Sequence, residues 1–197
     1  MNKRLRPQNT LRQTRNIEFF REFLREPEIV GSIIPSSRFL EEKIIRAAGL
    51  TDCRLVIELG PGTGSTTINF LRHMPANASL LTIEISKAFT ECLNTINDAR
   101  LINHCGNAEA IETLLQQYDL PAPDVVISGI PFSTIALETG RQILSTVHDN
   151  LAPGGRFVAY QFRDQVAQLA TPIFGEPEVN QELRNIPPMR VYRWLKP

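Results

Sequence analysis

Short apolar runs alternate with longer amphipathic segments along most of this chain. Most positions of these runs are apolar, as in strands of a parallel sheet when both faces of the sheet are buried. These runs span residues 55–59, 80–85, 100–105, 124–128 and 156–162. The amphipathic segments between them span residues 65–73, 87–97, 111–118 and 137–151. This alternation predicts an α/β fold with a doubly wound, mostly parallel sheet.

The last part of the chain has a different pattern. A short helix is expected over residues 166–173, followed by strands over 178–185 and 190–195. The two strands are joined through the turn-forming pair Pro187-Pro188, so we expect them to form a terminal antiparallel pair. The sheet then has seven strands, and its ligands are expected beyond the carboxyl ends of the parallel strands.

Residues 1–30 differ from the domain that we expect over residues 31–197. Residues 1–26 hold seven Lys or Arg side chains and three glutamates. A helix is predicted from about Thr14 to Glu26, where Pro27 ends it. Its apolar face consists of Ile17, Phe19, Phe20, Phe23 and Leu24. Such a face beside a basic tail suits insertion at an anionic membrane surface, and packing on the domain as a lid is the alternative.

Composition limits the classes of protein that fit. The chain has 197 residues and a formal net charge of zero, so bulk charge does not indicate a nucleic-acid partner. Its three cysteines are far apart in sequence, and its three histidines lack metal-ligand spacing, so no metal site is expected. No apolar run reaches the length of a bilayer span, and no signal peptide is evident. We therefore expect a cytoplasmic protein, soluble or peripheral to the membrane.

The clearest motif follows the first strand. Glu58-Leu59-Gly60-Pro61-Gly62-Thr63-Gly64 places three glycines at alternate positions, and a helix start follows at Ser65. Glycines let the backbone turn sharply and approach a ligand closely. The motif is not a P-loop, since no Gly-Lys-Ser/Thr follows, and its third glycine comes too early for the G-x-G-x-x-G dinucleotide pattern.

An acid ends the second strand twenty residues after the last of these glycines. Glu84 can accept two hydrogen bonds from a ribose diol there, and the apolar Ile85 follows it. Together, the pattern E-x-G-x-G-x-G and the strand-terminal acid resemble the cofactor corner of S-adenosylmethionine-dependent methyltransferases of the Rossmann-like class. The resemblance implies that S-adenosylmethionine is bound by Glu58, Gly60, Gly62, Thr63, Gly64, Glu84 and Ile85.

Four further residues are candidates for cofactor contacts. Ser36 lies at the start of a predicted helix, whose amino end can hold a carboxylate, and taken alone a plain helix cap is the favoured alternative. Asn107 and Ala108 follow the third strand, where this class reads the adenine amine; a turn asparagine is the alternative for Asn107. Ser128 ends the fourth strand, beside the expected position of the reactive methyl group.

The exit of the fourth strand departs from nucleobase-modifying members of the class. Those enzymes usually carry Asn or Asp, then two residues, then an aromatic, and here Ser128-Gly129-Ile130-Pro131 stands instead. Serine and glycine supply neither the hydrogen-bonding fork nor the stacking ring that a flipped base needs.

Four segments together resemble one family, from about residue 17 onward. They are Gly31–Ser37, Glu58–Gly64, Ser128–Pro131 and Asn185–Pro188. In this order they are similar to the bacterial phospholipid N-methyltransferases, of the soluble Rossmann-like type related to rRNA adenine dimethylases. The resemblance implies methylation of phosphatidylethanolamine toward phosphatidylcholine, with an N-terminal helix docked on the inner face of the membrane. The family more often has Asp at the position of Asn107.

The expected chemistry is an in-line methyl transfer, in which orientation contributes most. The attacking amine must lose a proton, and Ser128 and Tyr160 are the candidate catalytic acceptors, although Tyr160 also fits a plain strand aromatic. Phe132 and Tyr160 are candidates to hold a methylated cation. Three arginines near the terminal strands are candidates for the lipid phosphate, and each also fits a solvated surface position: Arg184, Arg190 and Arg193.

Two other functions remain open from the sequence. One is an rRNA adenine N6-dimethyltransferase-like enzyme, which the cofactor corner and basic N-terminus allow, but the zero net charge and missing fork disfavour. The other is a lipid-binding relative without catalysis, because a fold does not fix a function.

Overall fold

The structure is a computed structural model that describes residues 37–197. The helix expected within residues 1–30 and the candidate Ser36 lie outside the described residues, and both stay predictions. Over the described residues the expected alternation of strands and helices is present, and element bounds differ from prediction by a few residues.

Seven strands form one sheet in the order β3-β2-β1-β4-β5-β7-β6. The strands are β1 Leu55–Leu59, β2 Ser79–Glu84, β3 Leu101–Cys105, β4 Val125–Ser128, β5 Arg156–Gln161, β6 Glu178–Glu182 and β7 Met189–Leu195. The strands β1 to β5 are parallel to one another, whereas β7 runs antiparallel to both β5 and β6. The predicted doubly wound sheet and its terminal antiparallel pair are therefore confirmed.

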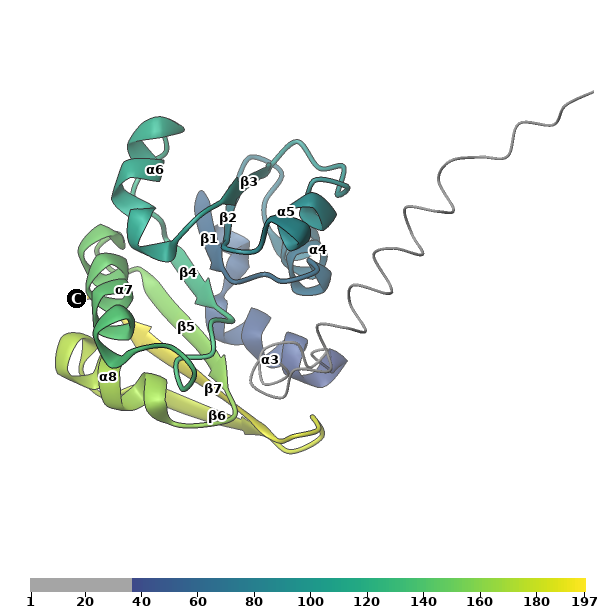
Figure 1. The fold of residues 1–197 in the computed structure, drawn as a ribbon. Helices are drawn as coiled ribbons and strands as arrows, with labels where there is room; N and C mark the ends of the chain where they lie inside the picture. The colour runs from purple at the N-terminus through teal and green to yellow at the C-terminus, as the bar shows by residue number, and fades with distance from the viewer. Residues whose placement is uncertain (1–36) are drawn as a thin grey trace, which may run out of the picture. The chain divides into compact units, whose positions relative to one another are not determined.

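Helices cover both faces of the sheet (Figure 1). They are α3 Arg38–Ala48, α4 Ser65–His73, α5 Lys87–Leu93, α6 Ile111–Gln117, α7 Leu137–Asn150 and α8 Gln165–Phe174, with short 3₁₀ turns at Leu50–Asp52 (η1) and Ala108–Ala110 (η2). The helices α3 and α4 pack on one face, and α6, α7 and α8 pack on the other. This arrangement leaves the carboxyl ends of the parallel strands together at one edge, which we call the carboxyl edge.

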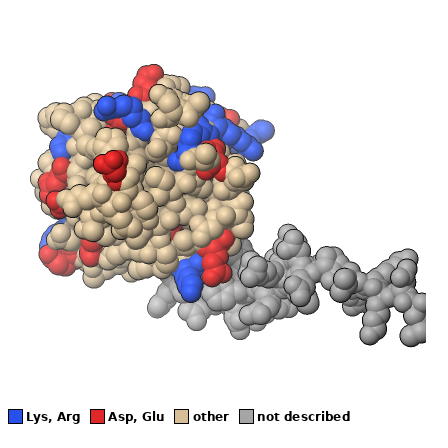
Figure 2. All heavy atoms as spheres, turned by 90° about the horizontal axis from the view of Figure 1, so that it is seen from above, with Lys and Arg blue, Asp and Glu red and all other residues tan. Residues whose placement is uncertain are grey.

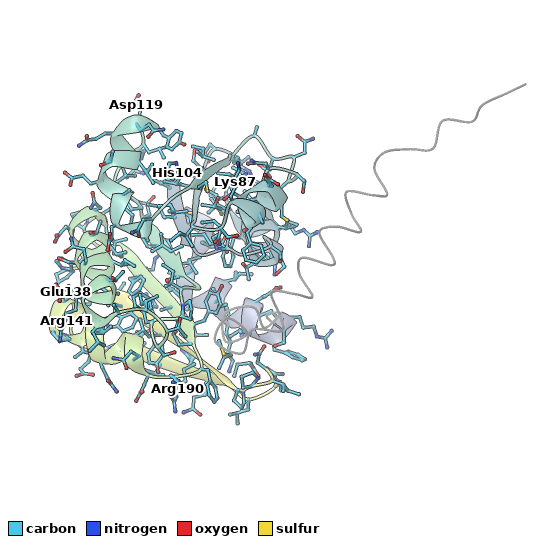
Figure 3. The ribbon with its side chains drawn as sticks, in the orientation of Figure 1. Lys87, His104, Asp119, Glu138, Arg141 and Arg190 are labelled. Carbon is cyan, nitrogen blue, oxygen red and sulfur yellow. The ribbon has the colours of Figure 1, made fainter. Side chains whose placement is uncertain are left out.

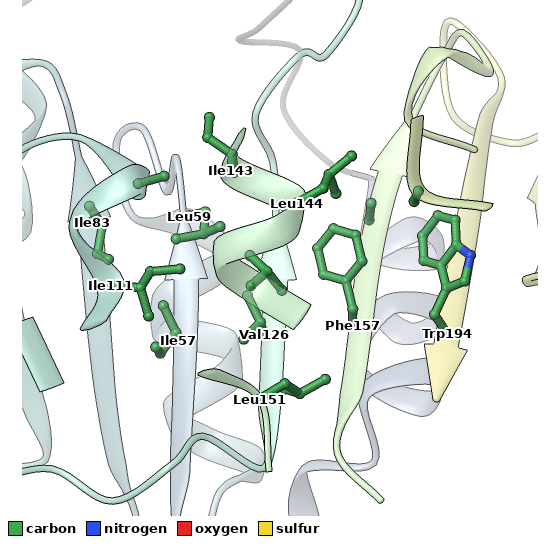
Figure 4. Close-up of a cluster of buried hydrophobic side chains, with 14 of the residues drawn as sticks. Ile57, Leu59, Ile83, Ile111, Val126, Ile143, Leu144, Leu151, Phe157 and Trp194 are labelled. Carbon is green, nitrogen blue, oxygen red and sulfur yellow. The ribbon is translucent and has the colours of Figure 1, made fainter. Parts of the chain in front are cut away.

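The strand β1 lies at the centre of the core, and all five of its residues are buried. Its side chains alternate between two clusters, with Ile57 facing α6 and α7 and Val56 facing α3 and α4. Figure 4 shows the first cluster, in which the rings of Phe157 and Trp194 stack at a centroid distance of 5.2 Å. Phe132 is 1% exposed within the same cluster, so it packs in the core and does not line a cation site as the sequence suggested.

Charged side chains of both signs lie around the rim of the face in Figure 2, and few lie at its centre. Among the described residues no helix is long and apolar enough to cross a bilayer.

Two segments that carry the family resemblance meet in the structure. The buried side chain of Asn185 accepts a hydrogen bond from the Ser37 backbone N–H at 2.9 Å and donates to the Pro187 carbonyl at 2.9 Å. The strand β6 ends at Glu182, three residues earlier than predicted, and Asn185 lies in the connection that follows. The start of α3 is thereby fixed to the β6–β7 connection.

Candidate active site

The ends of four parallel strands are held side by side at the carboxyl edge. Gly60 N–H donates to the Ile83 carbonyl, Gly129 N–H to the Leu59 carbonyl and Gly106 N–H to the Glu84 carbonyl, at 2.9–3.0 Å. These bonds continue the ladders β1–β2, β1–β4 and β2–β3 by one residue. The turns that follow β1, β2, β3 and β4 consequently begin at the same level of the sheet. The sequence predicted its candidate residues at these strand ends.

The glycine motif makes the turn from β1 into α4. Gly60, Gly62 and Gly64 have positive φ angles of 68°, 59° and 86°, a backbone conformation that other residues rarely adopt. At Gly64 an added Cβ would lie 2.8 Å from the end of the Leu93 side chain, which would have to shift to make room for it. At Gly62 an added Cβ would meet nothing within 4 Å, which leaves open space beside this part of the loop.

Glu84 is joined directly to this loop. Its carboxylate accepts one hydrogen bond from Gly62 N–H at 3.0 Å and another from Ser86 N–H at 2.9 Å. The side chain is 5% exposed, whereas the adjacent Ile85 is 79% exposed and presents an apolar side chain next to it. The structure thus brings together three residues that the sequence placed in one cofactor corner.

Glu58 has a different place from the one expected. It is fully buried, and its two carboxylate oxygens accept hydrogen bonds from the hydroxyls of Thr66 at 2.7 Å and Thr67 at 2.6 Å. Its side chain has no solvent-exposed surface, and its two hydrogen bonds hold the first turn of α4. Burial, and to a lesser extent the nearby Glu84, raise the pKa of Glu58 to about 7, although the two hydroxyls oppose the shift.

Ser128 and Ala108 are also enclosed. Ser128 is fully buried, and its hydroxyl accepts a hydrogen bond from Ile130 N–H at 3.3 Å, which shapes the turn after β4. The sequence predicted that Ser128 would face the reacting methyl group, whereas the structure encloses its side chain. Ala108 is 5% exposed within the core. Asn107 is exposed beside the end of β3, but its side chain caps η2 by accepting from Glu109 N–H at 3.1 Å.

Tyr160 lies at the carboxyl edge near the turn after β4. A Cβ added at Gly129 would lie 2.5 Å from the Tyr160 hydroxyl oxygen, so glycine at this position leaves room for the phenol. Burial raises the pKa of Tyr160 above its ordinary value, and the nearby Thr66 hydroxyl opposes this shift. Since the Thr66 hydroxyl itself donates to Glu58, the side chains of Tyr160, Thr66 and Glu58 follow one another from the carboxyl edge into the core.

The structure distinguishes the three arginines that were candidates for an anionic group. Arg184 forms an ion pair with Glu182 at 2.9 Å and stacks on the Phe39 ring, and Arg193 pairs with Glu178 at 2.7 Å. Arg190, labelled in Figure 3, forms no ion pair with a described residue. It lies opposite the buried Gln161 in the β5–β7 ladder, at the carboxyl edge.

Gln161 is a site-forming residue that sequence reasoning missed. Its amide donates to the Ile130 carbonyl at 2.7 Å and so fixes the turn after β4 from the side of β5. A polar residue at the end of a buried strand was the only signal available for it. Within residues 37–197 no group of three His, Cys, Asp or Glu side chains could hold a metal ion.

Solved structures share the fold of this chain. The N-methyltransferase NodS of Bradyrhizobium japonicum, in complex with S-adenosyl-L-homocysteine, superposes with a TM-score of 0.69 at 15% identity over 92% of this chain and 98% of its own. The O-methyltransferase TomG of Streptomyces achromogenes, in complex with S-adenosylmethionine, gives 0.68 at 16% identity over 93% and 89%. The fold is that of the S-adenosylmethionine-dependent methyltransferases. The predicted fold class is confirmed, and complexes with the predicted cofactor or its demethylated product are among these neighbours.

Sequence comparison adds relatives of two kinds. An ornithine lipid N-methyltransferase of Singulisphaera acidiphila is 28% identical over 177 residues, which cover 88% of this chain and 92% of that protein. The mitochondrial dimethyladenosine transferase 1 of Drosophila melanogaster is also 28% identical, over 88% of this chain, but the match spans only 54% of its length. No family model matches the chain.

The buried Glu58 predicts a specific dependence of stability on pH. A carboxyl group whose pKa is raised in the folded state stabilises the fold while it is protonated and loses that contribution as pH rises. As the pH rises from about 4.5 to about 8, ionisation of Glu58 should reduce the free energy of unfolding by roughly 3 kcal/mol. The variant Glu58→Gln removes this titration, since the amide stays neutral and one threonine hydroxyl can turn to accept from it.

The measurement is urea unfolding of both proteins at several pH values. The stability of the wild type relative to Glu58→Gln should fall across this range, and Glu91→Gln, an exposed acid on α5, serves as the control. A constant difference between wild type and Glu58→Gln would contradict the raised pKa.

Proposed function

We propose that this chain transfers methyl groups from S-adenosylmethionine to the amine of an amino-lipid head group at a membrane surface, with phosphatidylethanolamine as the first substrate to test. The observation that carries the proposal is the intact cofactor corner, Gly60–Gly64 with Glu84, next to a β4 exit that lacks the nucleobase fork. The lipid-modifying relative, matched over nearly its whole length, supports the same class of substrate and makes ornithine lipid the second candidate.

The corner fits the cofactor on the geometry of the chain itself. Backbone at Gly62 is open to solvent on the side where a Cβ would stand, and the Glu84 carboxylate lies next to it to accept a ribose diol. The exposed apolar side chain of Ile85 offers one face for the adenine ring. When bound, S-adenosylmethionine supplies an activated methyl group on a sulfonium, so the protein needs no nucleophile of its own.

The chain must still take a proton from the ammonium form of the substrate. We assign this acceptor to Tyr160, because Ser128 is enclosed and its hydroxyl already accepts from Ile130. The phenol oxygen receives the ammonium proton while its own proton passes to Thr66, and the proton of Thr66 passes to the Glu58 carboxylate. The amine becomes neutral and Glu58 becomes protonated, so atoms and charges balance.

An rRNA adenine N6-dimethyltransferase activity is the competing proposal, and the match to dimethyladenosine transferase 1 supports it. This chain spans about half of that protein's length, so activity of the whole relative is not carried over. The missing fork after β4 favours the lipid substrate over adenine.

The substrate proposal is tested with methyl-labelled S-adenosylmethionine. The protein is incubated in parallel with vesicles of phosphatidylethanolamine, with vesicles containing ornithine lipid and with ribosomal RNA. We expect label in an amino-lipid and none in RNA. Label in RNA alone would replace the lipid proposal with the competing one, and no label in any arm, with cofactor binding retained, would favour a non-catalytic relative.

The cofactor corner is tested at Glu84. Glu84→Gln keeps the shape of the side chain but removes the charge and one of the two acceptors available to the diol, so affinity for S-adenosylhomocysteine should fall by about 10- to 100-fold. Titration calorimetry measures the affinity, and Glu91→Gln is the control. Equal affinities of wild type and Glu84→Gln would place the ribose elsewhere.

The proton path is tested by comparing Tyr160→Phe with Ser128→Ala. Tyr160→Phe should lower kcat by at least about 100-fold near neutral pH, and Ser128→Ala should have a much smaller effect. In the wild type kcat should rise with pH through about 7, because the Glu58 carboxylate must be ionised to accept the proton. Tyr160→Phe should lose this rise and recover only as the amine itself deprotonates. A variant Tyr160→Phe with the pH profile of the wild type would exclude the path.

A further inference from the structure

The exposed large apolar side chains gather at one edge of the described domain. Eight such side chains are exposed among the described residues, and four of them lie in the connections after β4, β5 and β6. They are Leu137 (53% exposed), Phe162 (55%), Leu183 (71%) and Ile186 (89%). Isolated exposed apolar residues are ordinary, but several on adjacent connections are a mark of an interaction surface.

Topology brings these connections to the same edge. The strands β4 and β5 are parallel and adjacent, and β6 runs in their direction because both β5 and β6 pair antiparallel with β7. The connection between β6 and β7 consequently leaves from the carboxyl edge, as do the connections after β4 and β5. These apolar side chains therefore lie on the same edge of the sheet as the Gly129–Ile130 turn, where the proposed amine substrate enters, with the β5 connection next to that turn and the β6–β7 connection two strands further along.

Two of the apolar residues are each followed at once by an arginine. Phe162 precedes the exposed Arg163, and Leu183 precedes Arg184, whose side chain is 60% exposed. An apolar side chain next to a guanidinium matches the interface of an anionic bilayer, where the first enters the acyl boundary and the second meets lipid phosphates.

The acids on the same connections do not cancel this pattern. Glu182 is buried between two cations, Arg184 and Lys43, so this group of three keeps one positive charge, and the Arg184 side chain stays 60% exposed although it is paired. Glu138 lies 3.7 Å from Arg141. Asp164 is exposed at the amino end of α8, where a helix favours negative charge.

We propose that the connections after β5 and β6, with Phe162, Leu183 and Ile186 as the inserting side chains and Arg163 and Arg184 as the lipid-phosphate contacts, dock the carboxyl edge on an anionic phospholipid bilayer. The inference rests on the proposed function, since it names the surface through which a lipid substrate reaches the site. It is separate from the helix expected within residues 1–30, and it assigns docking to the catalytic domain itself.

The experiment uses the full chain and vesicles of phosphatidylethanolamine with phosphatidylglycerol. The triple variant Phe162→Ser, Leu183→Ser, Ile186→Ser is compared with the control Val179→Ser, Leu195→Ser, which removes two exposed apolar side chains toward the opposite edge. Co-sedimentation should show that vesicle partitioning of the triple variant falls by about tenfold or more and that of the control by less than about twofold. Binding of S-adenosylhomocysteine to each variant reports that the fold is intact.

A second arm separates docking from catalysis. Methylation is measured on vesicles and on dihexanoyl phosphatidylethanolamine below its micelle concentration, and the ratio of the two rates should fall by about tenfold in the triple variant but not in the control. Equal losses on both substrates would overturn docking and place these side chains in the site. Unchanged partitioning of the triple variant would also overturn the docking proposal. The same holds if the triple variant changes only self-association, measured by sedimentation velocity.

The proposed function can fail independently. If the wild type methylates neither form of the lipid, the substrate proposal fails, whereas the partitioning experiment still decides the docking surface. The variant Arg163→Gln, Arg184→Gln should lose partitioning to vesicles with phosphatidylglycerol and lose little to vesicles of phosphatidylcholine alone. Equal losses on both vesicles would overturn the assignment of the arginines.

Discussion

The hydrogen bond from Gly62 N–H to the Glu84 carboxylate joins the turn after β1 to the end of β2. The rest of the candidate site depends on this junction. It requires the positive φ angles that glycine allows, and it requires β1 and β2 to end at the same level, which their parallel register provides. A backbone N–H donor and a carboxylate acceptor are thereby held on a rigid strand edge, with open space beside them.

Beneath this junction the core contains a carboxyl group, Glu58, whose ionised form is destabilised by burial. Glu58 is enclosed by α4 and β1, and its hydrogen-bond partners within the described part of the chain are the two threonine hydroxyls. A buried carboxyl group that titrates near neutral pH is unusual, and such groups gather at functional sites. The Thr66 hydroxyl that donates to Glu58 lies near the Tyr160 phenol at the carboxyl edge, so the proposed proton path and the pH dependence of stability involve the same cluster.

The parts of the site that could be predicted from the sequence are those that depend only on where each strand ends. Buried runs and a glycine turn are visible in the residues, so the pairing of Glu84 with the glycine loop was predictable. The roles of Glu58 and Ser128 were not, because whether a side chain at a strand end faces a ligand or the core depends on packing of distant helices. Asn107 shows the same limit, since its local bond to Glu109 competes with any ligand. The link from Asn185 to Ser37 spans 148 residues and leaves no local trace in the sequence.

The central claim is that the cofactor lies along the glycine turn and the end of β2. Its most direct test is a titration of the ¹⁵N-labelled chain with S-adenosylhomocysteine, followed by amide NMR spectra. The account predicts saturable shifts of the Gly62, Gly64 and Ile85 amides at one equivalent, with the distant Gly154 and Gly175 amides unmoved. Shifts confined to other parts of the sheet, or no shifts at saturating ligand, would contradict it.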